Sequence, residues 1–128
     1  MYAIISKETL SIIALKPDLP ALVPGYISVE VPDDYNLSSQ YVNSDFTLVD
    51  KIIIDYTINN GILTINNTGT DLIKVRVMGA PDSDKPGIII DVFIIDLSVS
   101  NTLDLSNYIG DYVVIYGDKY KNETFEII

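Results

Sequence analysis

Apolar and polar residues alternate along much of the chain with the two-residue period of β-strands. The pattern is clearest where Ile73, Val75 and Val77 take every second position and Lys74 and Arg76 stand between them. In such a strand one face enters a core and the other meets solvent. The chain is also rich in Ile, Val and Thr, whose branched side chains suit pleated strands. The sequence therefore predicts an all-β protein.

A tight hairpin is predicted near the middle of the chain. The turn at 59–61 reads Asn-Asn-Gly, and these residue types accept the positive φ angles that a two-residue hairpin turn requires. The returning strand is expected at 62–66. The strand before the turn is expected to carry four residues on one face: Ile52, Ile54, Tyr56 and Ile58.

Residues 1–45 differ from the rest of the chain in proline content and in the length of their candidate strands. They hold four of the six prolines, Pro17, Pro20, Pro24 and Pro32, and their candidate strands are short. Segments 2–6 and 10–15 form a predicted hairpin, and an alternating strand follows at 26–31. We interpret residues 1–45 as an N-terminal β-arm or small β-module with its linker, and residues 46–128 as the main domain.

The linker is placed at residues 35–44, which are polar and rich in Ser and Asn. One helical turn is predicted within it, around 37–41.

Residues 88–97 are apolar at almost every position, interrupted only by Asp91 and Asp96. The pattern predicts a strand that is buried on both faces, so something must cover it. The arm or the long loops of the same chain are one candidate, and a neighbouring subunit, including another copy in a homo-oligomer, is the other. The residues proposed to contact a partner are Ile88, Ile90, Val92 and Ile94.

Two strands are predicted at the C-terminal end. In the first, Tyr112, Val114 and Tyr116 share a face that we expect to lie inside. In the last, residues 123–128, Phe125 and Ile127 are expected to point inward.

Residues 103–114, Leu-Asp-Leu-Ser-Asn-Tyr-Ile-Gly-Asp-Tyr-Val-Val, resemble the E-strand, corner and F-strand of immunoglobulin-like sandwiches. With the strands at 62–66 and 73–77 and the closing strand, the region is similar to the immunoglobulin-like modules of Bacteroidetes proteins. The resemblance implies an immunoglobulin-like β-sandwich over 46–128. The Cys pair and the buried Trp of antibody domains are absent, so it concerns architecture and not recognition loops.

The opening of the chain carries a second resemblance. Residues 1–10, Met-Tyr-Ala-Ile-Ile-Ser-Lys-Glu-Thr-Leu, and 25–35, Gly-Tyr-Ile-Ser-Val-Glu-Val-Pro-Asp-Asp-Tyr, are similar to N-terminal segments of small virion and fibre-associated proteins of tailed phages. The resemblance implies a capsid auxiliary or decoration protein, or a head or tail fibre component. The implied partners are other virion proteins, above all the major capsid protein.

Eighteen acidic and eight basic residues give a net charge of −10, spread along the chain. A phosphate backbone would be repelled, so nucleic acid is not an expected partner. A soluble, acidic exterior is the preferred interpretation of this charge. An acidic anti-defence protein that mimics nucleic acid is the alternative.

Residue types that carry much enzyme chemistry are missing. The chain has no His and no Cys, which removes Ser-His-Asp and Cys-His catalysis, thiol nucleophiles and the His- and Cys-based zinc sites. Asp82 and Asp84 would supply two oxygen ligands for calcium, but the EF-hand spacing is missing, so a solvated loop is preferred. We predict a protein that is not an enzyme and that has no cofactor, metal or catalytic residue.

The cellular location is inferred from the first residues and from the length of the apolar runs. The first residues lack a basic segment followed by an apolar stretch, so no signal peptide is expected, and no apolar run is long enough to span a membrane. Together with the resemblance to phage virion proteins, this implies a protein made in the host cytoplasm and assembled into a virion. A carbohydrate-binding or adhesin module is the alternative, with a sugar-binding face built from exposed tyrosines: Tyr26, Tyr35, Tyr41, Tyr108 and Tyr120.

Overall fold

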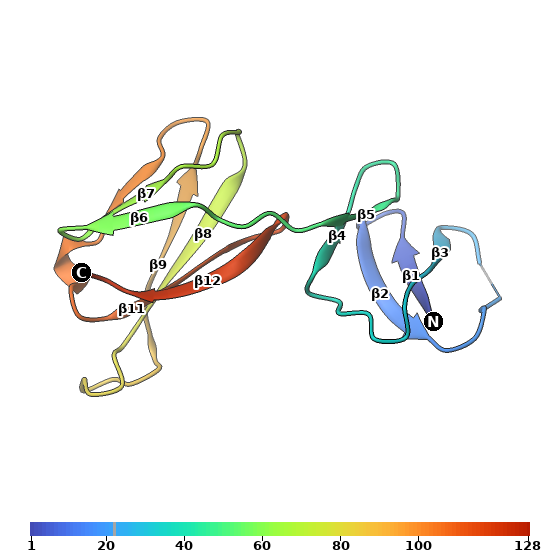
Figure 1. Ribbon diagram of the computed structural model, residues 1–128, viewed down its shortest axis with the longest axis horizontal. Coiled ribbons are helices and arrows are strands. Elements are labelled where there is room, and N and C mark those ends of the chain that lie inside the picture. Colours follow the sequence, from blue (N-terminus) through green and yellow to red (C-terminus); the bar gives the residue numbers. More distant parts are fainter. Residues whose placement is uncertain (22) are drawn as a thin grey trace. The chain divides into compact units, whose positions relative to one another are not determined.

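Strands make up nearly all of the regular structure of this protein (Figure 1). The computed structural model describes residues 1–21 and 23–128. In chain order its elements are β1 (Tyr2–Ser6), β2 (Ser11–Lys16), β3 (Tyr26–Glu30), β4 (Gln40–Val42), β5 (Leu48–Asp50), β6 (Tyr56–Asn59), β7 (Ile62–Ile65), β8 (Leu72–Met78), β9 (Ile89–Asp96), β10 (Thr102–Asp104), the 3₁₀ turn η1 (Ser106–Tyr108), β11 (Tyr112–Gly117) and β12 (Tyr120–Glu126). The predicted all-β class is confirmed. The described residues contain no helix with the length and apolar character needed to cross a membrane.

The chain divides into two compact units, Met1–Lys51 and Ile52–Ile128. The sequence placed the division between residues 45 and 46. The structure places it later because β5 pairs with β4 in an antiparallel hairpin, which holds residues 46–51 to the N-terminal unit.

The N-terminal unit contains a three-stranded antiparallel sheet in the order β2-β1-β3, as the hairpin and third strand predicted. Ala3 and Ile5 on the central strand are fully buried. The predicted linker with a helical turn at 37–41 is wrong, because β4 occupies 40–42. The Asn36 side chain explains the difference. Its carbonyl oxygen accepts hydrogen bonds from the backbone and the hydroxyl of Ser38, which closes a tight turn instead of a helix.

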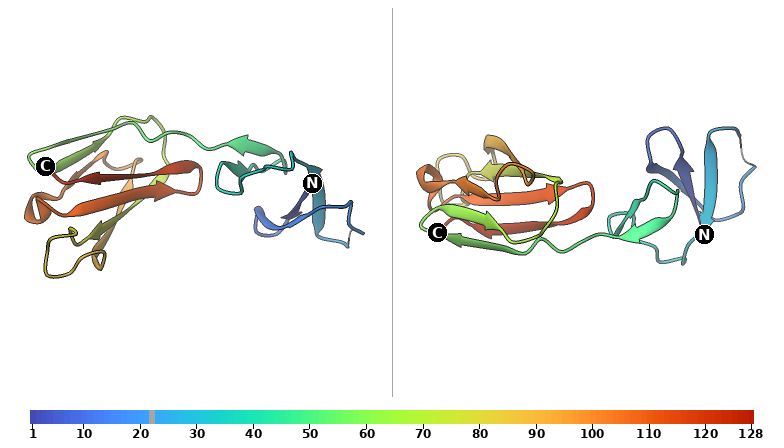
Figure 2. Two further views of the ribbon diagram at one scale, coloured as in Figure 1. Left: turned by 60° about the horizontal axis from the view of Figure 1, so that its bottom comes forward. Right: turned by 90° about the horizontal axis from the view of Figure 1, so that it is seen from above.

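The C-terminal unit is a β-sandwich of a three-stranded sheet, β10-β7-β6, and a four-stranded sheet, β12-β11-β8-β9 (Figure 2). With β6, β7, β8, β10, β11 and β12 taken as strands A, B, C, E, F and G, the sheets contain the A-B-E and C-F-G neighbours of the immunoglobulin fold. The remaining strand, β9, is added to the C-F-G sheet next to β8. The predicted immunoglobulin-like sandwich is therefore the architecture of this unit.

Both sheets contribute to one apolar core. Leu63 and Ile65 come from β7, and Ile73, Val75 and Val77 come from β8; all five are fully buried. The alternation predicted for β8 is confirmed, because its other residues face outward.

The Asn-Asn-Gly hairpin turn is also confirmed. Asn60 and Gly61 have φ angles of 52° and 77°. At Gly61 a Cβ atom would lie 2.4 Å from the Cα of Ser106, so the turn requires glycine both for its φ angle and for this close approach.

The predicted inward face of β11 is wrong. Val113 and Ile115 are fully buried, whereas Tyr112, Val114 and Tyr116 are only half-buried. Directly opposed residues of an antiparallel pair share a face, and Val113 and Ile115 stand opposite the buried Val77 and Val75 of β8.

For the last strand the prediction holds. Ile127 is fully buried, and Phe125 packs against the core and stacks on Tyr56 with ring centroids 4.1 Å apart.

Candidate functional site

The predicted partner-contact residues lie at the β9 edge of the four-stranded sheet and are exposed. Ile88, Ile90, Val92 and Ile94 have 56%, 40%, 54% and 59% of their surface accessible to solvent. Cover for its second face by a neighbouring subunit stays a prediction, because within the sandwich only one face of this strand is buried. Its inner side carries the buried Ile95 and the half-buried Phe93, and its outer side is open.

Of these four residues, Val92 and Ile94 stand in regular register opposite β8. The β8–β9 register shifts between Val77 and Met78, so that Ile89 stands opposite Met78 and Ile90 is the extra residue of a bulge. Beyond the bulge the regular register returns. Val92 stands opposite Arg76, and Ile94 stands opposite Lys74.

Lys74 and Arg76 project from the centre of the same outer face, where they meet Tyr116 of β11. The Arg76 guanidinium lies 5.3 Å from the Tyr116 ring centroid and donates a hydrogen bond of 3.2 Å to its hydroxyl. The Lys74 ammonium lies 5.9 Å from the same centroid. Among the described residues, neither cation forms an ion pair with a carboxylate of this chain. We call Val92, Ile94, Lys74, Arg76 and Tyr116 the outer face.

The backbone at the free edge of β9 is protected. Leu97 donates its N–H to the carbonyl of Asp71, so the pair Leu72 and Asp96 is a non-hydrogen-bonded one. By the alternation of an antiparallel ladder, the N–H and C=O groups of Val92 then point away from β8. The Asp91 carboxylate accepts the Val92 N–H at 2.9 Å. A carboxylate bound to an edge N–H and a β-bulge both hinder an edge strand from pairing with another strand.

Asp91 also holds the corner of the sandwich. Its second carboxylate oxygen accepts the hydroxyl of Tyr108, which lies edge-on to Phe93. The hydrogen bond to Asp91, followed by burial and by the Asp91 charge, raises the pKa of Tyr108 above its usual value of 10.0. The corner tyrosine therefore fastens η1 to the start of β9.

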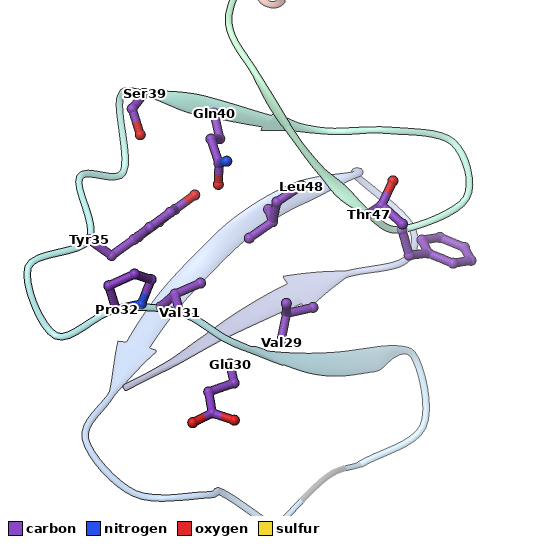
Figure 3. A pocket seen from close by; sticks show the side chains of 10 residues that line it. Val29, Glu30, Val31, Pro32, Tyr35, Ser39, Gln40, Thr47 and Leu48 are labelled. Carbon is purple, nitrogen blue, oxygen red and sulfur yellow. The ribbon is translucent and has the colours of Figure 1, made fainter.

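A second candidate site lies wholly within the N-terminal unit (Figure 3). It is an open pocket of about 460 Å³ between the end of β3, the loop that follows it and the β4–β5 hairpin. Apolar side chains form much of its wall: Val29 of β3, Val31 and Pro32 just after β3, and Leu48 of β5. Its polar lining includes Tyr35, Ser39 and Gln40.

The Tyr35 hydroxyl is the distinctive polar group of this pocket. Its oxygen is shielded from solvent and finds no hydrogen-bond partner among residues 1–21 and 23–128. Burial, with a smaller effect from the charge of Asp50, raises the pKa of Tyr35. A buried hydroxyl without a partner costs about 1–3 kcal/mol, so folding leaves this hydroxyl with a hydrogen-bonding capacity that the chain does not use.

The tyrosines expected at a sugar-binding face have different surroundings in the structure. Tyr26 is exposed, Tyr35 lines the pocket, and Tyr41 is half-buried. The Tyr108 hydroxyl donates a hydrogen bond to Asp91. The prediction for Tyr120 is wrong: it is 2% exposed within the core, and its hydroxyl donates to Asp71 at 2.8 Å. No role was predicted for Lys74 and Arg76. The sequence shows them only as two cations on the polar face of a strand.

The outer face and the pocket contain no His and no Cys, since the chain has none. Within residues 1–21 and 23–128, no group of three or more acidic residues is placed to hold a metal ion. No family model, no curated protein and no solved structure matches this chain. The outer face and the pocket are therefore the features from which a function can be inferred.

Proposed function

We propose that this protein is a non-enzymatic structural component that docks onto a partner protein through the outer face of its sandwich. The observation that carries the proposal is the exposed pair Val92 and Ile94 beside Lys74 and Arg76. Burying the exposed part of each aliphatic side chain contributes roughly half of the 1.5–3 kcal/mol that full burial provides. The two cations have no acidic partner on the described part of the chain and select a surface that bears carboxylates. The partner surface thus combines apolar side chains with acidic groups.

Docking uses side chains and not the addition of a strand. The Val92 N–H is occupied by Asp91, and the bulge at Ile90 interrupts the edge. A strand that paired with β9 would have to displace the Asp91 carboxylate from this N–H. A partner that packs onto the side chains leaves it in place.

The assembly that we propose is the virion of a tailed bacteriophage, with this chain as an auxiliary or decoration protein on the major capsid protein. The similarity of residues 1–10 and 25–35 to small virion proteins supports this assignment, and the sandwich supplies a rigid module to display. A head or tail fibre component would use the same outer face and would differ in its place on the particle.

Incorporation into particles tests the proposal. Phage that lacks the gene is complemented with wild-type or variant protein, and the copies per major capsid protein are counted by quantitative mass spectrometry. The double variant Val92→Asp with Ile94→Asp should lower incorporation more than about tenfold, because two buried apolar contacts are replaced by charges that repel an acidic surface. Lys74→Glu should act in the same direction.

Two matched controls separate docking from general charge effects. Val99→Asp changes a residue that is 82% exposed in the turn after β9, and Lys85→Glu reverses a lysine in the loop before it. Both should incorporate like the wild type. Absence of the wild-type protein from purified particles, or equal incorporation of the double variant, would refute the proposal.

A further inference from the structure

Two asparagines of this chain precede a small residue: Asn43 stands before Ser44, and Asn60 stands before Gly61. The other asparagines precede Leu, Tyr, Glu, Thr or a second Asn. Asparagine is a labile residue, because the backbone nitrogen of the next residue can attack its side-chain carbon Cγ and displace the amide as ammonia. A small next residue leaves this attack unhindered, and glycine hinders it least. The sequence alone therefore ranks Asn60 as the most reactive asparagine, followed by Asn43.

The fold protects Asn60. The Gly61 nitrogen, which would attack, donates its hydrogen to the carbonyl oxygen of Ile128 at 2.8 Å. Gly61 is also buried, and it lies so close to the backbone of Ser106 that a Cβ atom would not fit between them. The attack requires the nitrogen to lose its proton to hydroxide and to move toward the Asn60 side chain. Asn60 therefore reacts only in the fraction of molecules in which this turn has opened.

The turn between β4 and β5 has the opposite arrangement. The Ser44 nitrogen donates its hydrogen to the side-chain oxygen Oδ1 of Asn43 at 2.9 Å. This hydrogen bond holds the attacking nitrogen beside the carbonyl group whose carbon it attacks, and such proximity lowers the barrier of a reaction. Ser44 is exposed, so hydroxide and water reach its N–H. The reaction at Asn43 therefore needs no opening of the fold.

The rest of this turn is held by its own hydrogen bonds. The Asn43 N–H donates to the carbonyl of Thr47 at 2.8 Å, and the Asn43 carbonyl accepts from the Phe46 N–H at 2.9 Å. The Asp45 carboxylate accepts from both the backbone N–H and the hydroxyl of Thr47. These bonds fix the backbone on both sides of Ser44. The entropy cost of bringing the nitrogen to the side chain is thus met by folding.

We propose that Asn43 is a site of spontaneous deamidation in the folded protein, and that folding inverts the order of reactivity of Asn43 and Asn60. The Ser44 nitrogen loses its proton to hydroxide and forms a bond to Asn43 Cγ. Water returns a proton to the side-chain nitrogen, which leaves as ammonia. A second water then opens the cyclic imide at either carbonyl, which gives aspartate or isoaspartate at position 43. Both products add one negative charge to the β4–β5 turn, and isoaspartate also lengthens its backbone by one methylene.

Peptide mapping by mass spectrometry measures both rates in one sample. The purified full chain is incubated at mildly alkaline pH, either folded in buffer or unfolded in guanidinium chloride. Asn43 should react faster than Asn60 in the folded chain, and Asn60 should react faster in the unfolded chain. Folding should raise the ratio of the Asn43 rate to the Asn60 rate by at least about tenfold. A faster reaction at Asn60 in the folded chain, or the same order of rates in both states, would overturn the proposal.

A variant tests whether the Ser44 nitrogen is the attacking atom. Ser44→Val places a branched side chain next to this nitrogen at an exposed position, so it should slow deamidation of Asn43 by at least about tenfold in both states. The rate at Asn60 in the same molecule is the control and should not change. An unchanged rate at Asn43 would contradict the mechanism. The amide spectrum of the variant reports whether it is folded.

Discussion

Among single residues, Tyr35 and Tyr108 have opposite effects on stability. The hydroxyl of Tyr35 is buried without a partner, whereas that of Tyr108 donates to a carboxylate. A buried polar group stabilises a fold only when it is paired. The Tyr35 hydroxyl therefore lowers stability, whereas the Tyr108 hydroxyl contributes to it.

Removing the Tyr35 hydroxyl should stabilise the protein. We expect Tyr35→Phe to raise the free energy of unfolding by about 1 kcal/mol, because the penalty for desolvating an unpaired group disappears. Urea denaturation followed by far-UV circular dichroism measures the change, and Tyr26→Phe should leave stability within about 0.5 kcal/mol of the wild type. A loss of stability in Tyr35→Phe would show that the hydroxyl is paired in solution.

The corner tyrosine should make stability depend on pH in the alkaline range. Because the pKa of Tyr108 is raised in the folded state, the neutral phenol is favoured there, and its stabilising contribution is complete below the usual pKa of 10.0. The contribution is lost as pH rises through the folded-state pKa. The difference in unfolding free energy between the wild type and Tyr108→Phe should therefore be constant at neutral pH and shrink above pH 10. Titration of the other tyrosines is common to both proteins, so a difference that stays constant would contradict this account.

At the scale of the element, the sequence predicts strands better than it predicts their faces. The alternation around Ile73 and Val75 identifies both a strand and its buried side, because the residues between them are polar or long. Around Val113, Val114 and Ile115 both faces are apolar, so the period of two does not determine which one enters the core. The pairing of β11 with β8 determines which face is buried. This pairing joins residues far apart in the sequence, so the segment alone does not determine it.

The same reason limits what could be foreseen of the two sites. The apolar character of β9 is visible in the sequence, but the bulge and the placement of Lys74 beside Ile94 depend on the register with β8. The pocket depends on the turn that Asn36 closes and on the β4–β5 hairpin, in a stretch whose Ser and Asn content indicated a linker.

The hairpin turn at Gly61 offers a test of packing between elements. Gly61→Ala should lower the free energy of unfolding by roughly 2 kcal/mol or more, because strain from a positive φ is added to a clash with the Ser106 backbone. Gly110→Ala is the matched control in the same unit. Gly110 also has a positive φ, of 95°, but a Cβ there would meet nothing within 4 Å, so the smaller cost of about 1 kcal/mol from backbone strain is expected. Equal costs at the two positions would show that the contact between the turn and η1 is not tight.

At the scale of the whole molecule, each of the two units carries one candidate site. The sandwich presents an apolar and cationic outer face on an otherwise acidic protein, and the N-terminal unit holds an open pocket.

Cryo-electron microscopy of the phage particle would show whether the outer face packs onto another virion protein. We expect density for the sandwich with Val92 and Ile94 buried against the major capsid protein and with carboxylates of that protein next to Lys74 and Arg76. Particles that lack the protein, or a bound sandwich whose outer face remains open to solvent, would refute the proposed docking.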